Sequence, residues 1–531
     1  MRMRDLFIGG LVVAILAGPS VSVAAEAGCE DDVAVDRFQY YRQLSLDLRQ
    51  RVPTETELTA LIDRGDLSEV DIRAMLADPD FDQFIRRYHT DLFWPAIDIG
   101  EIVEAAFAFL LPASFYGDDG DPMRLFALYP ALYNRGGLVP CADEPAEFDD
   151  AGDPIFKPWP DGTMREGYVM VEPYWAPGTE VKVCALEARL HPTTPSGLNC
   201  DTAEGMNTGY CGCGPDLRNC VSVESSQRIV DSLREQLNRQ FINPIQSGAS
   251  YFEALTANTE MLNGPLVHYY RYLAHLAVDP IIQIPPVPTA WLDDVPFTDP
   301  TWKSYARSPE HSGILTSLSY LLRFPTGRSR ANQFYSTMLC QPFVAAADLV
   351  LPSPNDECSD DPNLRTRCGC SACHTVLEPA SGYWARFSES GSMYLNPLGF
   401  PERREDCAVC KSTPGMVCDF LCDRFYLTEA GHPDEEPWVG TLISHVFRDD
   451  DELTNVNGGP KSLVEEKLAQ GSMPQCVVRR LYSRFHNQEM TATERKTLLP
   501  ELVERFEKSD YDFKDLILAI VSLPTYRRML R

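Results

Sequence analysis

The distribution of cysteine is the feature that most constrains how this 531-residue chain can fold. Of its 17 cysteines, six lie between residues 141 and 220 and nine between residues 340 and 422. This number is too small for a miniature disulfide scaffold and too large for a protein that functions among cytosolic reductants. We therefore expect a large protein with an ordinary core and two irregular, disulfide-linked regions, whose pairing cannot be deduced from sequence.

The amino terminus is typical of a secretory signal peptide. Arg2 and Arg4 precede an apolar stretch at residues 6–18, and the small residues that follow predict cleavage after Ala25. The stretch is too short to span a bilayer, and no other apolar run approaches that length. We therefore expect an exported protein, periplasmic or at the cell surface, with no transmembrane span.

Cys29 follows the predicted cleavage site closely enough to be considered as a lipid anchor. The small pair Ala27-Gly28 fits a lipoprotein signal, but the charged Glu26 stands where such a signal has leucine. A disulfide or a free thiol is the favoured interpretation of Cys29.

The chain is strongly acidic, with a formal net charge of −30 at pH 7. A surface of this charge has no means of neutralising phosphates, which excludes nucleic acid and anionic lipid headgroups as expected partners.

Helical patterns flank the cysteine-rich regions. Thr54 with Glu57 and Thr491 with Glu494 are capping boxes, which predict helix starts at these positions. Apolar residues at helical spacing predict buried stripes. In the N-terminal part these are Leu58, Leu61, Ile62, Phe81, Phe84 and Ile85, and in the C-terminal part Leu498, Leu499, Leu502, Val503 and Phe506.

These patterns predict a mainly α protein with a c-type haem-binding region and cysteine-rich irregular or short-β insertions. We expect helix from residue 223 through residue 241, from residue 253 to residue 275, and again near residues 315–324. The predicted organisation is a signal peptide (1–25), an N-terminal helical domain (30–100), a cysteine-rich loop and β insert (101–222), a helical domain (223–330), a haem-binding cysteine-rich region (331–445) and a C-terminal helical domain (446–531).

One motif carries specific chemistry. Cys370-Ser371-Ala372-Cys373-His374 has the Cys-x-x-Cys-His spacing that attaches c-type haem. Two thiols add to the porphyrin vinyl groups, and the adjacent histidine becomes the proximal iron ligand. We predict one haem c, held by Cys370 and Cys373 with His374 as ligand. The competing interpretation is a disulfide with His374 as an incidental neighbour.

The sixth iron ligand is less constrained. Met416 lies in an irregular segment of the kind that can present a thioether to iron, and Met393 is the next candidate. His432, His445 and an open position are the alternatives.

A second pair, Cys407 and Cys410, lacks the histidine. Together with Cys418 and Cys422 it suggests two disulfides, or alternatively a tetrathiolate zinc site. Two haem thiols leave 15 cysteines from the 17, an odd number, so at least one is free, lipidated or paired between chains.

Four groups of short strings resemble the cytochrome-c-associated domains of planctomycetes and myxobacteria, in the same order along the chain. They are Leu46-Asp47-Leu48 with Pro53-Thr54, Leu255-Thr256-Ala257-Asn258 with His268-Tyr269-Tyr270, His311-Ser312-Gly313 with Leu339-Cys340-Gln341-Pro342, and Asp512-Phe513 with Ser522-Leu523-Pro524-Thr525-Tyr526. The resemblance covers most of the chain outside residues 101–222. It implies a mainly helical exported protein with one c-type haem, in a family whose biochemical role is largely undefined.

The chain departs from the family after the haem motif. The family usually has Asp-Pro and Gly-Phe where this chain has Glu378-Pro379 and Gly382-Tyr383. The departure leaves haem attachment intact and makes the pocket beyond the motif less predictable.

The sequence thus predicts an exported, c-type cytochrome-like redox protein whose haem serves electron transfer or a periplasmic or surface oxidation system. Its acidity favours a basic redox partner. The alternative is a secreted, disulfide-stapled binding or structural protein without haem. Catalytic residues are not identifiable, and the sequence does not distinguish an electron carrier from an enzyme.

Overall fold

The computed structural model is mainly helical with short strands, which confirms the predicted fold class at that level. It describes residues 33–97, 111–112, 114–116, 122–124, 141–142, 144–194, 196–200, 211–221, 223–276, 286–343, 356–389, 393–442 and 450–529. The predicted signal peptide, Cys29 and His445 lie outside these residues. None of the helices in these ranges is long and apolar enough to cross a membrane.

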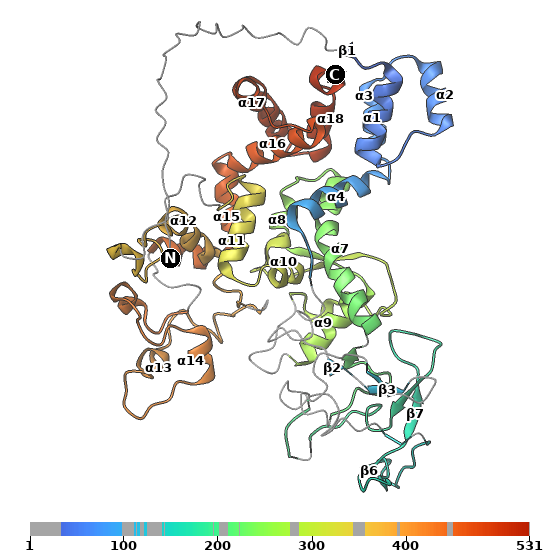
Figure 1. Ribbon diagram of the computed structural model, residues 1–531, viewed down its shortest axis with the longest axis vertical. Coiled ribbons are helices and arrows are strands. Elements are labelled where there is room, and N and C mark those ends of the chain that lie inside the picture. Colours follow the sequence, from blue (N-terminus) through green and yellow to red (C-terminus); the bar gives the residue numbers. More distant parts are fainter. Residues whose placement is uncertain are drawn as a thin grey trace, which may run out of the picture.

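The helices form the body of the molecule (Figure 1). They are α1 (Arg37–Arg49), α2 (Glu55–Arg64), α3 (Glu69–Leu76), α4 (Phe81–Phe93), α7 (Val223–Ser247), α8 (Glu253–Thr256), α9 (Gly264–Leu276), α10 (Leu318–Arg323), α11 (Gly327–Met338), α12 (Ser371–Ser381), α13 (Glu405–Val409), α14 (Phe420–Phe425), α15 (Asp450–Ala469), α16 (Ser472–His486), α17 (Ala492–Lys508) and α18 (Phe513–Val521). Short 3-10 helices include η2 (Gly313–Thr316), η4 (Gly382–Trp384) and η5 (Pro433–Trp438).

The strands are two to four residues long and lie mostly in the first cysteine-rich region, at the opposite end of Figure 1 from the chain's C-terminus. β4 (Pro122–Arg124), β3 (Ser114–Tyr116), β8 (Val181–Cys184) and β7 (Tyr168–Val171) form one antiparallel sheet in that order. The remaining strands pair in twos: β1 (Val33–Ala34) with β12 (Arg528–Met529), β2 (Leu111–Pro112) with β9 (Cys220–Val221), β5 (Lys157–Pro158) with β6 (Met164–Arg165), and β10 (Thr259–Leu262) with β11 (Lys303–Ala306).

Both predicted capping boxes are confirmed. The Glu57 N–H donates to Thr54 Oγ1 at 3.2 Å, and the Thr54 N–H donates to Glu57 Oε2 at 2.7 Å. Thr491 and Glu494 exchange the same two bonds at the start of α17. The predicted stripe of α2 is wrong at Ile62, which is 57% exposed because only the Leu58 and Leu61 side of this helix faces the core.

Helices from both ends of the chain share one hydrophobic core. Its largest buried side chains include Phe84 of α4, Phe241 of α7, Phe334 of α11, Tyr482 of α16 and Phe513 of α18. The chain ends also meet, since the Tyr40 hydroxyl donates to the Val521 carbonyl at 2.9 Å and the Tyr526 hydroxyl to Asp47 Oδ2 at 2.6 Å. The C-terminal helices are therefore packed against α1.

A disulfide adds a covalent link to this packing. Cys340, just after α11, is bonded to Cys476 of α16, 136 residues later in the chain. The bond joins two core helices that are distant in sequence.

The helix expected from residue 253 to residue 275 is interrupted, so that prediction is wrong in its middle part. β10 replaces it at residues 259–262 by pairing antiparallel with β11. The strand places Glu260 fully inside the protein, where the buried guanidinium of Arg307 acts on it electrostatically.

Burial raises the pKa of Glu260 to about 7, against 4.5 in an exposed glutamate. The carboxyl group therefore binds its proton more tightly in the folded chain than in the unfolded chain. Its contribution to stability is complete below about pH 4.5 and is lost as the pH rises through about 7.

We predict that Glu260→Gln, which cannot ionise, will gain stability relative to the wild type as the pH rises. The variant should differ little at pH 5, and its free energy of unfolding should improve relative to wild type by up to about 3 kcal/mol at pH 8. Urea unfolding of both proteins at the two pH values measures this. A difference that does not change with pH would contradict the burial argument.

Candidate haem-attachment site

The predicted attachment residues lie at the start of α12. Gly369, with a φ of +75°, turns the chain into the helix, and the disulfide between Cys358 and Cys368 anchors the turn just before it. Cys370 already has helical backbone angles, and its carbonyl accepts the N–H groups of Cys373 at 3.1 Å and His374 at 3.0 Å. Residues three and four apart share one face of a helix. The structure therefore brings Cys370, Cys373 and His374 together on one face of α12.

Cys370 and Cys373 are both unbonded and partly exposed. Elsewhere in the described ranges, disulfides join Cys200–Cys211, Cys340–Cys476, Cys358–Cys368, Cys407–Cys422 and Cys410–Cys418. The motif thus keeps two thiols in a chain rich in disulfides. This arrangement disfavours the interpretation in which the motif is a disulfide.

The imidazole of His374 is oriented by a carboxylate. Its Nδ1 contacts Glu378 Oε1, one helical turn later, and the Glu378 side chain is only 2% exposed. A carboxylate accepts hydrogen bonds, so Nδ1 donates, and in the tautomer that this contact selects the lone pair is on Nε2. Carboxylates bonded in this way to the second nitrogen are the usual partners of metal-ligating histidines.

Glu378 is itself held by Arg328 of α11. The guanidinium donates from Nε at 2.9 Å to Oε1 and at 3.1 Å to Oε2, and from Nη2 at 3.0 Å to Oε2. This forked geometry fixes the carboxylate in orientation as well as in charge. Arg328, Glu378 and His374 therefore form a chain of contacts from α11 to the motif.

The two faces of α12 differ in burial. Leu377, Glu378 and Ala380 are buried toward the core, whereas Thr375 and Val376 are exposed. The buried face is the one that His374 shares with Glu378, and Cys370, Cys373 and His374 lie partly exposed at its N-terminal end.

The two candidate methionine ligands lie in different surroundings. Met393 is 1% exposed and packs in a small hydrophobic cluster with Phe400 and Phe425. Met416 is 44% exposed, in a turn where its N–H donates to the Thr413 carbonyl at 3.1 Å. Packing therefore already accounts for Met393, whereas the thioether of Met416 is accessible.

His432 also lies in this part of the molecule. Hydrogen bonds from Thr366 and Asn363 lower the pKa of Asp361, and His432 lies close enough to add to this effect when its ring is protonated. His432 Nδ1 accepts the Asp434 N–H at 3.3 Å. The residue is therefore near the segment that precedes the motif, and its Nδ1 is used by the backbone of η5.

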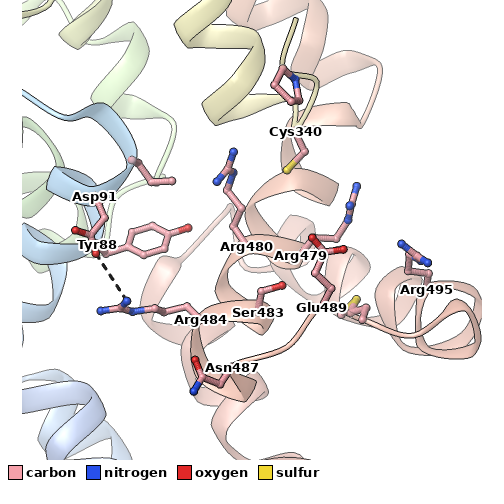
Figure 2. Close-up of a pocket in the computed structure, with 13 residues that line it drawn as sticks. Tyr88, Asp91, Cys340, Arg479, Arg480, Ser483, Arg484, Asn487, Glu489 and Arg495 are labelled. Carbon is pink, nitrogen blue, oxygen red and sulfur yellow. Dashed lines mark ion pairs between the residues drawn. The ribbon is translucent and has the colours of Figure 1, made fainter. Parts of the chain in front are cut away.

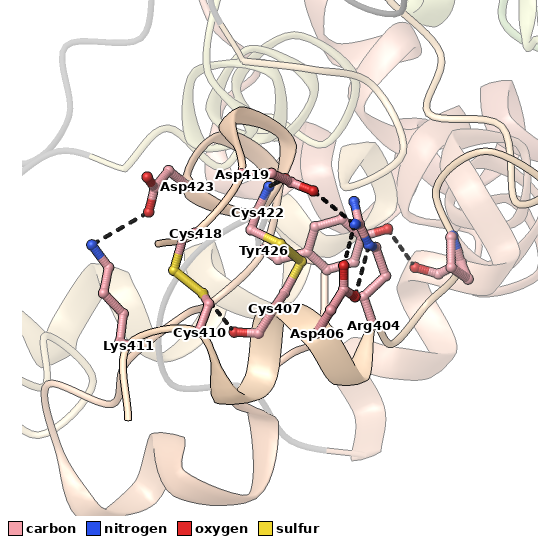
Figure 3. The surroundings of a disulfide bond; sticks show 11 residues. Arg404, Asp406, Cys407, Cys410, Lys411, Cys418, Asp419, Cys422, Asp423 and Tyr426 are labelled. Carbon is pink, nitrogen blue, oxygen red and sulfur yellow. Dashed lines mark hydrogen bonds and ion pairs between the residues drawn. A yellow bond between two sulfur atoms is a disulfide. The ribbon is translucent and has the colours of Figure 1, made fainter. Parts of the chain in front are cut away.

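The second cysteine group forms two disulfides, as the first of its two interpretations predicts. Cys407 is bonded to Cys422 and Cys410 to Cys418 (Figure 3). Asp406, Cys407 and Cys422 are close enough to hold a metal ion, but a sulfur atom in a disulfide is not a thiolate ligand. Arg404 bridges Asp406 and Asp419 across this group, so the loop is held by charge as well as by sulfur.

The donor set fits the haem that the sequence predicts. Two unbonded thiols and one imidazole with an available Nε2 lie on one helix face, which is the set that c-type attachment requires. Sequence reasoning missed Glu378 and Arg328 as supports of His374. The i, i+4 spacing from His374 was the available signal for Glu378, whereas Arg328 is distant in sequence.

Comparisons with known proteins return no match, whether with family models, curated proteins or solved structures. The function therefore has to be inferred from the geometry of α12 and its neighbours.

We predict that Arg328→Ala will destabilise the chain by about 1–3 kcal/mol, because it leaves a buried carboxylate without its main partner. Arg403→Ala is the matched control, since Arg403 pairs with Glu405 where both side chains are exposed, and should cost less than about 0.5 kcal/mol. Urea unfolding at pH 7 compares them. Equal losses in the free energy of unfolding would show that the pair of Arg328 and Glu378 contributes no more than an exposed ion pair.

Proposed function

We propose that this chain is an exported c-type cytochrome-like redox protein with one covalently attached haem, used in electron transfer or in a periplasmic or surface oxidation system. The observation that carries the proposal is the face of α12. There the thiols of Cys370 and Cys373 remain unbonded beside His374, whose Nδ1 is engaged by Glu378.

The two thiols are the groups that attach the porphyrin. Each adds across one vinyl group, so that a carbon–sulfur bond forms and the thiol hydrogen moves to the neighbouring carbon. The addition consumes no oxidant, and it requires thiols rather than a disulfide. The helical spacing of Cys370 and Cys373 presents both sulfur atoms on the side of α12 that His374 shares.

His374 is the proposed proximal ligand through Nε2. Glu378 fixes the tautomer and the ring orientation, and it raises the basicity of the ring as a ligand. When bound, the haem supplies one-electron chemistry. The protein adjusts that chemistry through the sixth ligand, the Glu378 contact and the burial of the site.

Two observations support export. Residues 1–25 have the pattern of a signal peptide, and the disulfides of the described residues are typical of an oxidising compartment. An oxidising compartment outside the cytoplasm is also where c-type haem is attached.

The acidity of the chain supports a basic redox partner. A net charge of −30 would speed association with a positively charged protein, and added salt would slow it. Nucleic acid is a poor partner for the same reason.

We predict that the chain, co-expressed with the periplasmic haem-maturation apparatus, will retain haem on a denaturing gel and show a reduced-minus-oxidised haem spectrum. Cys370→Ala/Cys373→Ala should lose all covalent haem, since both carbon–sulfur bonds are removed. The matched control is Cys410→Ala/Cys418→Ala, which also removes two sulfur atoms and should keep the haem. A wild-type protein without covalent haem would favour the disulfide-stapled binding or structural protein instead.

We further predict that Met416, the accessible thioether, is the sixth ligand. Met416→Ala should change the spectrum of the oxidised protein and allow carbon monoxide to bind readily to the reduced protein. Met393→Ala removes a buried methionine and serves as the control, with an unchanged spectrum expected. If Met416→Ala leaves the spectrum unchanged, Met416 is not the ligand.

A further inference from the structure

A cavity of about 590 Å³ lies where α4, α16, the start of α17 and the residues after α11 meet. Cys340 lines it (Figure 2), and the disulfide between Cys340 and Cys476 fixes this part of the wall. The cavity is therefore lined by core helices and is separate from the face of α12 that carries the haem motif.

The lining of this cavity is basic, although the chain as a whole is strongly acidic. Arg479, Arg480, Arg484 and Arg495 line it, against two acidic residues. A net charge of −30 makes a local excess of arginine inside a concavity unusual for this protein. Low-dielectric walls strengthen the field of such a group of charges, which attracts anions.

Two of the arginines are partly engaged by the protein. Arg484 pairs with Asp91 at 3.7 Å, as Figure 2 shows, and Arg480 donates to the Ser336 carbonyl. The Nε atom of Arg480 is buried without a hydrogen-bond partner.

The other two arginines have no charged partner in the part of the chain that the structure describes. Within the residues that the structure describes, the guanidinium groups of Arg479 and Arg495 form no ion pair or hydrogen bond. Arg479 comes from α16 and Arg495 from α17, so they line the cavity from different helices (Figure 2). Two guanidinium groups placed in this way suit a ligand with more than one anionic group.

We propose that this cavity binds a small organic anion that carries two or more carboxylate or phosphate groups. The volume lies within the range of small-molecule sites and far exceeds the needs of a single inorganic ion. Leu92, Pro342 and Met490 line the same cavity and provide apolar contact for a carbon skeleton. The arginines bind the charged groups, and the proposal does not depend on haem.

The experiment is isothermal titration calorimetry of the full chain at constant ionic strength. The ligands are citrate, succinate, fructose 1,6-bisphosphate, inorganic phosphate and, as a neutral control, sucrose. We expect at least one polyanion to bind at least about tenfold more tightly than inorganic phosphate, and sucrose not to bind. A preference for carboxylates or for the bisphosphate identifies the chemistry of the anionic group. Absence of binding by all three polyanions would overturn the proposal.

Variants assign the binding to the cavity. Arg479→Gln/Arg495→Gln should weaken binding of the polyanion by at least about tenfold, because each lost guanidinium removes charge-assisted hydrogen bonds. Arg42→Gln/Lys461→Gln is the control, since it removes the same charge from two exposed side chains outside the cavity and should leave the affinity nearly unchanged. Equal weakening by both pairs would mean that only net charge matters, which would overturn the proposal.

A third variant removes a negative charge from the cavity and is expected to bind more tightly. A variant that fails to fold would not gain affinity, so this result cannot come from misfolding. Glu489 is exposed and lines the cavity as one of its two acidic residues. Glu489→Gln removes a repulsive charge, so it should tighten binding of the same polyanion several-fold. Weaker binding by this variant would contradict the proposed role of the cavity.

Discussion

The position of the motif helix depends on one buried charge, the guanidinium of Arg330. This side chain is fully buried, and it donates to the Phe324 carbonyl at 2.8 Å, the Phe387 carbonyl at 2.8 Å and the Ser388 carbonyl at 2.9 Å. Burial lowers its pKa to about 10, so it remains charged at neutral pH. A buried charge is tolerated only when its donors are satisfied, and here the acceptors come from the end of α10 and from the chain after η4. Arg330 therefore fixes where the chain returns after α12, and its neighbour Arg328 then fixes Glu378 and His374.

The parts of the structure that could be predicted from sequence are those determined by neighbours in the chain. Thr54 with Glu57 identifies a helix start because both partners lie within one turn. The shared face of Cys370 and His374 likewise follows from helix geometry alone. Arg328 could not be predicted, because its partner Glu378 lies 50 residues away and the contact exists only once α11 packs on α12. The prediction that Ile62 is buried is wrong for a related reason. The spacing of apolar residues along α2 does not say how much of the helix surface the neighbouring helices cover.

Tertiary contacts bring together short sequence segments that are far apart in the chain. Ser312 Oγ donates to the Leu255 carbonyl at 2.7 Å, and the Gly313 N–H donates to the Ala257 carbonyl at 3.0 Å. These residues belong to two of the strings that resemble the cytochrome-associated family. The long insert between α4 and α7 does not separate those helices, because His89 of α4 stacks on Phe241 of α7 at 3.8 Å. The described part of the insert packs on these helices, because Trp175 and Val183 share a hydrophobic cluster with Leu233 of α7.

The bond between Cys340 and Cys476 has a consequence for the integrity of the chain. It encloses residues 341–475, and with them α12 and both disulfides of the second cysteine group, in one covalent ring. A protease that cuts this ring once produces two polypeptides that remain joined through the cystine. The segment that carries the motif would then stay linked to the rest of the molecule. A protein cut once in this ring would migrate as one species on a denaturing gel and separate into two fragments only after a reductant is added.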